Sequence, residues 1–205
     1  MSEVSLRKMT KSDLDDVVKL HQQAFHGFFL VQMGPQYIKA YYSIVLAYEG
    51  SITYVYDGKS NILEGFVVGF VEPAAFYKKF TRSGLQLVYP ILSGVIHNPC
   101  LLFKVVESIR RVFSAASQSG KYIIDKETAE LSSIAVGSSA KGNGSILINA
   151  FVKEVWSRGL TNITLTTDYE NNELVNNFYI KHGFTRNGLE VRNGRKLWRY
   201  DLTKD

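Results

Sequence analysis

The stretch from Glu130 to Phe184 constrains the fold of this chain more than any other part. A short apolar run ending at Val136 is typical of a buried strand, and a loop with glycines at 142 and 144 follows it. The loop leads into an amphipathic helix over about Asn143–Arg158 and a second strand over Asn162–Thr167. A strand, a crossover helix and another strand in this order form a parallel pair. We therefore predict an α/β core.

The segments around this stretch complete a mixed sheet. Alternating or β-branched runs predict strands, and Asn193-Gly194 is a strong hairpin signal between the last two of them. In chain order the predicted strands are Val4–Met9, Ser51–Tyr56, Ile62–Val71, Leu131–Val136, Asn162–Thr167, Glu190–Arg192 and Arg195–Leu202. Thr10 and Asp13 have the spacing of a capping box and, with apolar periodicity, predict a helix from Thr10 to near Gly27. The same kinds of signal predict helices from Pro35 to Gly50 and from Asn171 or Asn172 to His182.

Between Pro73 and about Thr128 the pattern changes to helical segments, at Ala75–Ser83, Leu85–Ile96 and Leu101–Ala116. This insert concentrates the positive charge of the chain, because between Lys78 and Lys121 only Glu107 opposes its basic residues. Those residues are Lys78, Lys79, Arg82, Lys104, Arg110, Arg111 and Lys121. We expect one domain over residues 1–205, with a helical insert at about 74–127.

Composition narrows the class of protein. The single Cys100 cannot form an intramolecular disulfide, and the first ten residues carry charges where a signal peptide needs an apolar run. The most apolar window, Leu85–Val106, is interrupted by Pro90 and Lys104, so we predict no membrane-spanning helix. A cytoplasmic protein is expected. The net charge of +5 permits an anionic ligand without demanding nucleic acid, and the four histidines lack the spacing of a metal site.

The glycine loop has the chemistry of a phosphate cradle. Glycines let the backbone approach a ligand closely, and the amides at the start of the next helix favour negative charge. A Walker loop would need Lys-Ser/Thr after Gly142, where the chain has Asn143-Gly144. A Rossmann fingerprint would need a third glycine at Leu147. Neither motif fits, and a turn that uses its glycines for tight geometry alone remains the alternative.

Taken together with the helix downstream, these residues resemble the GCN5-related N-acetyltransferase (GNAT) superfamily. Its motif Gln/Arg-x-x-Gly-x-Gly/Ala falls on Ser139–Gly144, with Ser139 replacing the usual residue in a loop about two residues short. Its motif Asn-x-x-Ala-x-x-apolar-Tyr-x-Lys-x-Gly-Phe falls on Asn172–Phe184. The resemblance implies a GNAT fold, an α/β (α+β) mixed sheet of six to seven strands. Its fourth and fifth strands splay apart, and a long helical insertion separates the third and fourth.

The resemblance also implies acetyl-CoA as co-substrate, with no metal. The pantetheine arm of the cofactor is then expected between the splayed strands and its pyrophosphate on the glycine loop. The residues that match the cofactor-binding positions are Ser133, Ile134, Ala135, Val136, Lys141, Gly142, Asn143, Gly144, Ser145, Asn172 and Tyr179.

Three catalytic roles follow from the same resemblance. The Val136 amide would polarise the thioester carbonyl, and Tyr179 would protonate the departing thiolate. Glu130, six residues before Val136, is the candidate general base, with Asp168 or a water chain as alternatives. Each side chain also has a structural interpretation, since Glu130 begins a strand and Tyr179 belongs to a predicted apolar stripe of its helix with Leu174, Val175 and Phe178.

The acceptor is expected to be a small molecule with a primary amine, acetylated directly in a ternary complex by a monomer or homodimer. The predicted acceptor residues are His26, Phe28, Phe29, Tyr77 and Asp168. Aromatic and basic residues together would suit an amino sugar or a sugar nucleotide, through stacking and charge. The alternative is that the aromatics fill the core and the lysines only solvate a helix.

Two other functions compete with the enzyme. One is a degenerate protein that binds CoA without catalysis, suggested by Ser139 and the short loop. The other is a peripheral membrane or partner-binding module that uses the basic, apolar insert.

Overall fold

A computed structural model describes residues 5–58, 62–97, 127–140, 142–192 and 194–204. Its strands form one seven-stranded mixed sheet, in the order β1-β2-β3-β4-β5-β7-β6. The strands are β1 (Ser5–Lys8), β2 (Ser51–Asp57), β3 (Leu63–Val71), β4 (Thr128–Val136), β5 (Asn162–Asp168), β6 (Thr185–Arg192) and β7 (Arg195–Thr203). The helices are α1 (Leu14–Ala24), α2 (Phe29–Gln32), α3 (Pro35–Leu46), α4 (Pro73–Arg82), α5 (Gly84–His97), α7 (Gly144–Ser157) and α8 (Glu173–Lys181), with short 3-10 turns η1 (Lys11–Asp13) and η3 (Ser138–Ala140). The predicted α/β fold is confirmed.

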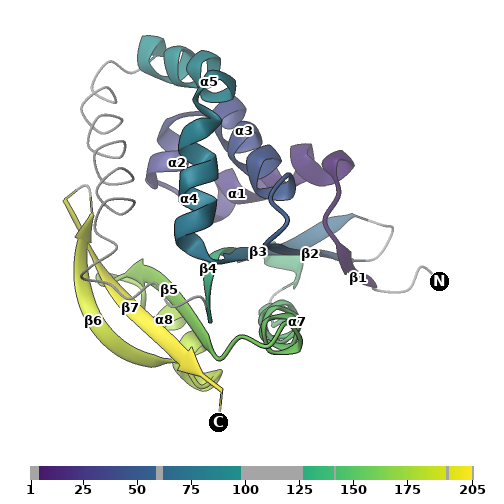
Figure 1. Ribbon diagram of the computed structural model, residues 1–205, viewed down its shortest axis with the longest axis vertical. Helices are drawn as coiled ribbons and strands as arrows, with labels where there is room; N and C mark the ends of the chain where they lie inside the picture. Colours follow the sequence, from purple (N-terminus) through teal and green to yellow (C-terminus); the bar gives the residue numbers. More distant parts are fainter. Residues whose placement is uncertain (1–4, 59–61, 98–126, 141, 193, 205) are drawn as a thin grey trace.

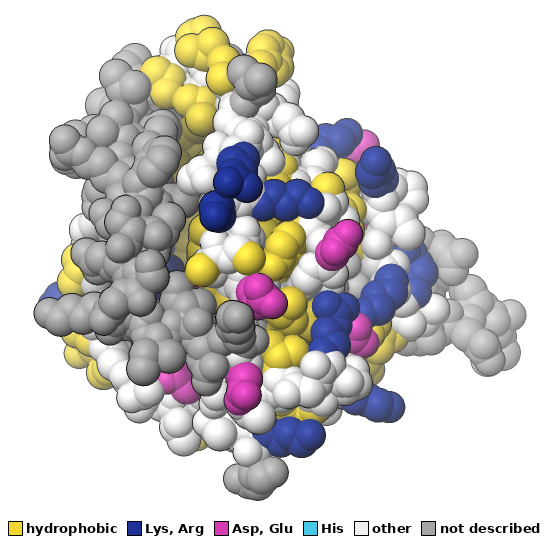
Figure 2. All heavy atoms as spheres, in the orientation of Figure 1, with side chains coloured by type: hydrophobic (Ala, Val, Ile, Leu, Met, Phe, Trp, Pro, Cys, Tyr) yellow, Lys and Arg dark blue, Asp and Glu magenta, His cyan; other side chains and the backbone are white. Residues whose placement is uncertain are grey.

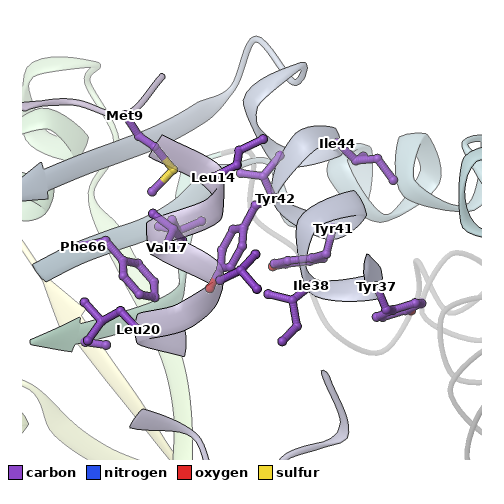
Figure 3. Packing of buried hydrophobic residues seen from close by; sticks show 14 of the residues in the cluster. Met9, Leu14, Val17, Leu20, Tyr37, Ile38, Tyr41, Tyr42, Ile44 and Phe66 are labelled. Atoms are coloured by element: carbon purple, nitrogen blue, oxygen red, sulfur yellow. The ribbon is translucent and has the colours of Figure 1, made fainter. Parts of the chain in front are cut away.

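Helices cover both faces of the sheet (Figure 1). One core packs α1 and α3 against the sheet and includes Tyr42 and Phe66, whose rings meet edge to face at 5.7 Å (Figure 3). The other core packs α7 and α8 against the opposite face and includes Phe151 and Tyr200. Each fully buried side chain of this size stabilises the fold by roughly 1.5–3 kcal/mol. Because β4 contributes Ala135 to the first core and other residues to the second, it is held from both sides.

The predicted splay between the fourth and fifth strands is present. Among the described residues, β4 and β5 pair in parallel only from Thr128–Asn162 to Glu130–Thr164. Beyond that point β5 stays paired with β7 to its end, while β4 continues beside β3. The β3–β4 register shifts next to Ser132, which has no opposite partner and forms a β-bulge. The strands thus separate at the bulge.

The N-terminal capping box is confirmed, although it opens a 3-10 turn ahead of α1. The Thr10 amide donates to the Asp13 carboxylate over 2.7 Å. Two guanidinium nitrogens of Arg7 donate to the same carboxylate, each over 2.8 Å, and a third nitrogen donates to Asp57 over 2.6 Å. This network holds the pKa of Asp13 down at about 2, chiefly through its hydrogen bonds with Arg7. It ties β1 and β2 to the start of α1.

Several local expectations need correction. The predicted apolar stripe of α8 is wrong at Leu174 and Val175, which are 88% and 39% exposed. The helix instead buries Asn176, whose side-chain oxygen accepts a hydrogen bond from the Tyr200 hydroxyl over 2.9 Å. Strand β6 begins at Thr185, five residues before the predicted start at Glu190. The short helix α2 was not expected.

The insert is described only in part. Its first two predicted helices are present as α4 and α5, between β3 and β4. The predicted third helix, Leu101–Ala116, lies outside the described residues, so the full extent of the insert stays a prediction.

Candidate active site

Beyond Glu130 the edge of β4 that faced β5 is unpaired among the described residues, and we call the space beside this edge the opening. The Gly137 amide donates to the Glu64 carbonyl over 2.7 Å. Since hydrogen-bonded pairs alternate along an antiparallel ladder, the amides of Ser133 and Ala135 also face β3. The amides of Ile134 and Val136 therefore point the other way, into the opening. The splay leaves these two predicted residues in position to bind an extended ligand.

The glycine loop lies at the carboxyl end of β4 and opens α7, as predicted. Gly142 adopts φ +99°, and a Cβ atom added there would meet nothing within 4 Å. The backbone of Gly142 is therefore open to a ligand. The first amides of α7, at Gly144 and Ser145, lie in the turn where a helix has no internal acceptor for them. The Asn143 side chain is used elsewhere, since its amide donates to the Tyr56 hydroxyl over 2.8 Å. Lys141 lies outside the described residues.

A histidine that the sequence did not single out joins this loop to α8. The Nδ1 atom of His182 donates to the Phe178 carbonyl over 2.7 Å. Its Nε2 atom lies 3.0 Å from the Ser145 hydroxyl. Since a neutral ring that donates from Nδ1 accepts at Nε2, Ser145 donates this bond when His182 is neutral. The two segments that carry the family motifs are thus in direct contact.

Tyr179 is both a core residue and a candidate catalytic group. Its side chain is only 5% exposed, and its ring packs against Phe184 and Tyr200 with centroid distances of 5.7 Å each. Burial raises the pKa of its hydroxyl, so the group stays protonated at neutral pH, as a general acid must. Within the described part of the chain, this hydroxyl has no hydrogen-bond partner.

Asn172 precedes α8 but does not cap it through its side chain. Its side-chain amide donates instead to the Thr167 hydroxyl over 2.8 Å and to the Asp168 carbonyl over 3.2 Å. Asn172 therefore fixes the start of α8 to the end of β5, beside the opening.

The candidate base Glu130 and the candidate acceptor residue Tyr77 are in direct contact. The Tyr77 hydroxyl, from α4, donates to Glu130 Oε1 over 2.7 Å. Burial raises the pKa of Glu130, while this hydrogen bond and the charge of Arg192 act in the opposite direction. A half-buried carboxylate with a raised pKa is suited to accept a proton near neutral pH. Arg192 was not predicted as a site residue.

Two other acceptor candidates, Asp168 and Phe28, lie beside Arg195. Its guanidinium is paired with the Asp168 carboxylate and lies 3.8 Å from the centroid of the Phe28 ring. Asp168 is thus already engaged, which makes it a poorer candidate base than Glu130. Phe29 packs against Tyr37 at 6.0 Å, and the His26 side chain is exposed. The sequence did not indicate Arg195 as a site residue, because Arg195 and Phe28 lie at opposite ends of the chain.

No group of three or more His, Cys, Asp or Glu side chains among the described residues is placed to bind a metal ion. No described helix is long and apolar enough to cross a membrane.

A hollow of about 620 Å³ at the start of α8 is lined by residues that were not predicted as site residues. They are Tyr169, Glu170, Asn171, Glu173, Asn176, Asn177, Arg186 and Trp198.

Three solved structures illustrate the fold likeness. The ribosomal-protein-S18-alanine N-acetyltransferase of Escherichia coli has 14% identity and a TM-score of 0.59, with 98% of this chain and 94% of that chain covered. An acetyltransferase of the GNAT family from Desulfovibrio desulfuricans has 15% identity and a TM-score of 0.63, with 98% and 99% covered. The PaiA N-acetyltransferase of Thermoplasma acidophilum, solved with coenzyme A, has 10% identity and a TM-score of 0.60, with 99% and 100% covered.

The sequence matches a protein-family model but no individual curated protein. No curated protein matches the sequence significantly. Residues 14–184 match the model of the acetyltransferase (GNAT) family, a range that contains both motifs and all the candidate site residues named in the sequence. The chain therefore belongs to the GNAT acetyltransferase family, and the N-acetyltransferase class expected from its sequence is confirmed.

Proposed function

We propose that this protein transfers the acetyl group of acetyl-CoA directly to the primary amine of a small acceptor, in a ternary complex. The observation that carries the proposal is the opening beside β4. It presents the amides of Ile134 and Val136 in line with the glycine loop and the first turn of α7. A pantetheine arm needs an extended backbone partner, and a pyrophosphate needs amides at a helix start. The extended backbone of β4 and the amides at the start of α7 follow one another here.

The proposed site divides the cofactor between two elements. The amide of Ile134 donates to the pantetheine arm, and the amide of Val136 donates to the thioester carbonyl. Gly142, Gly144 and Ser145 offer their amides to the pyrophosphate, and the open space over Gly142 supports a close approach. Backbone donors do not depend on the side chain at Ser139, so its departure from the family motif is compatible with binding.

The chemistry needs two protons to leave the acceptor nitrogen and one to reach the sulfur, and no other reactant. Glu130 first takes a proton from the acceptor ammonium, directly or through water, which leaves a neutral amine. The nitrogen lone pair then forms the N–C bond with the thioester carbonyl while the C–S bond breaks. Glu130 passes its first proton to solvent and takes the second from the nitrogen, while the sulfur gains one from Tyr179, which solvent then reprotonates. The raised pKa of Glu130 suits a base near neutral pH, and the raised pKa of Tyr179 keeps its proton in place until the thiolate departs.

The acceptor is proposed to bind where α2 and α4 approach the β6–β7 hairpin. Tyr77, Phe28 and Arg195 would supply an aromatic and cationic wall there. Such a wall suits a ring that carries a negative group, and an amino sugar or sugar nucleotide meets that description.

The test is release of CoA thiol from acetyl-CoA across a panel of amines that includes amino sugars, amino sugar nucleotides, polyamines and amino acids. We expect release that depends on the amine and is fastest with an amino sugar or its nucleotide. Glu130→Gln should lower turnover, with the exposed Glu173→Gln as the matched control. Release at the same rate with and without every amine would contradict the proposal.

A second role, contact with an anionic membrane surface, is favoured by α5. This helix has no charged residue, yet Val88, Tyr89, Leu92 and Ile96 are 49%, 73%, 55% and 75% exposed. Figure 2 shows hydrophobic side chains at this end of the molecule, with Lys and Arg side chains close by. Sedimentation with vesicles rich in phosphatidylserine should carry the protein down. Leu92→Glu should abolish this, while Gln23→Glu, on exposed α1 surface, should not.

A further inference from the structure

The insert after β3 supplies a side chain to the centre of the proposed site. Helix α4 begins at Pro73, directly after Glu72 in the left-handed region at φ 49°. The chain turns sharply there into α4, which brings Tyr77 to Glu130, 53 residues away in the chain. The phenol donates to Oε1 of the carboxylate over 2.7 Å.

Packing holds the Tyr77 ring in place. It meets the rings of Phe70 and Phe76 edge to face, with centroids 5.7 Å and 5.5 Å away. Phe76 is stacked on Phe70 at 3.8 Å, and both are fully buried. A donor fixed by such a cluster loses little conformational entropy when it binds the carboxylate, so the contact is pre-organised.

The charged and titratable groups around Glu130 are bound to other residues, and Tyr77 is its direct hydrogen-bond partner among the described residues. From β6, Arg192 is paired with Glu190 over 2.5 Å, and from β7, Arg199 is paired with Asp201 over 3.3 Å. From α3, the Tyr41 hydroxyl is bound to Ser132 over 2.6 Å. Among the described residues, only the Tyr77 hydroxyl forms a hydrogen bond with the Glu130 carboxylate. The other groups act through their charge.

We propose that Tyr77 is a positioning residue for Glu130: its hydroxyl binds Oε1 and directs Oε2 toward the acceptor amine. This inference rests on the proposed function for its catalytic consequence, but the contact itself can be tested without activity. A hydrogen bond to the ionised carboxylate stabilises that form, so its loss should make Glu130 easier to protonate.

The direct test is a titration of the Glu130 carboxyl by ¹³C NMR in the unliganded protein. Tyr77→Phe keeps the ring and its packing but removes the donor, so the pKa of Glu130 should move upward. Tyr41→Phe, which removes a neighbouring hydroxyl bound to Ser132, is the matched control and should move it much less. An unchanged Glu130 pKa in Tyr77→Phe, or an equal shift in Tyr41→Phe, would overturn the proposal.

Kinetics then connect the contact to the reaction. In Tyr77→Phe the acidic limb of the kcat profile should move to higher pH, with a loss of about tenfold on that limb and little change in KM for acetyl-CoA. A uniform loss at all pH values, without movement of the limb, would also overturn the positioning role. If the wild-type protein acetylates no amine while the NMR shift is present, the proposed function fails and the Tyr77–Glu130 contact stands.

Discussion

Replacing Val136 by proline removes one backbone donor from the proposed site and leaves the ladder with β3 intact. The register places the Val136 amide on the side away from β3, so proline deletes no strand–strand hydrogen bond there. Ala135→Pro is the matched control. Its amide faces Phe66 on β3, and losing it should cost about 1–3 kcal/mol of folding free energy.

The magnitude follows from the role proposed for this amide. A donor directed at the developing oxyanion is worth roughly 3–4 kcal/mol of barrier, so Val136→Pro should lower kcat by about 10²- to 10³-fold. Thermal unfolding would show whether the variant keeps its fold, and thiol release at saturating acetyl-CoA would measure kcat. A folded Val136→Pro protein with kcat within twofold of wild type would refute the assignment of this amide.

Three further predictions concern stability and cofactor binding. Burial lowers the pKa of His21 to about 4 from 6.5, so stability is full above pH 6.5 and is lost as pH falls toward 4. The loss should reach about 3 kcal/mol in urea unfolding and should disappear in His21→Phe. Asp13→Ala should cost about 1–3 kcal/mol at neutral pH in the same assay, because it removes the carboxylate bound by Arg7 and Thr10; equal stability of the two proteins would contradict the network. Gly142→Ala should cost only about 1–2 kcal/mol of stability for its positive φ but should raise KM for acetyl-CoA; an unchanged KM would remove this loop from the cofactor site.

Local sequence signals predicted the fold well. The strand–loop–helix run up to Arg158 and the helix ending before Gly183 follow from hydrophobic periodicity and glycine placement, and both are confirmed. Periodicity failed on α8 because the buried position is Asn176, a polar residue that is satisfied by Tyr200. A pattern that counts only apolar residues selects Leu174 instead, although that side chain is 88% exposed.

The site was harder to predict than the fold, because its contacts join distant segments. Glu130 and Tyr77 were each singled out from the sequence, but nothing in either segment indicated that they touch. Arg195 lies beside Phe28 only because the β6–β7 hairpin approaches the joint between α1 and α2. The bulge at Ser132 depends on how β4 pairs with β3, which no single strand sequence reveals.

Calorimetric titration of the protein with acetyl-CoA, followed by thiol release in the presence of the amine panel, tests the central claim most directly. We predict one saturable site per chain and CoA release only when an amine is present. Binding without release across the whole panel would favour a protein that binds CoA without catalysis. No binding of acetyl-CoA would contradict the account of the β4 opening and the glycine loop as a cofactor site.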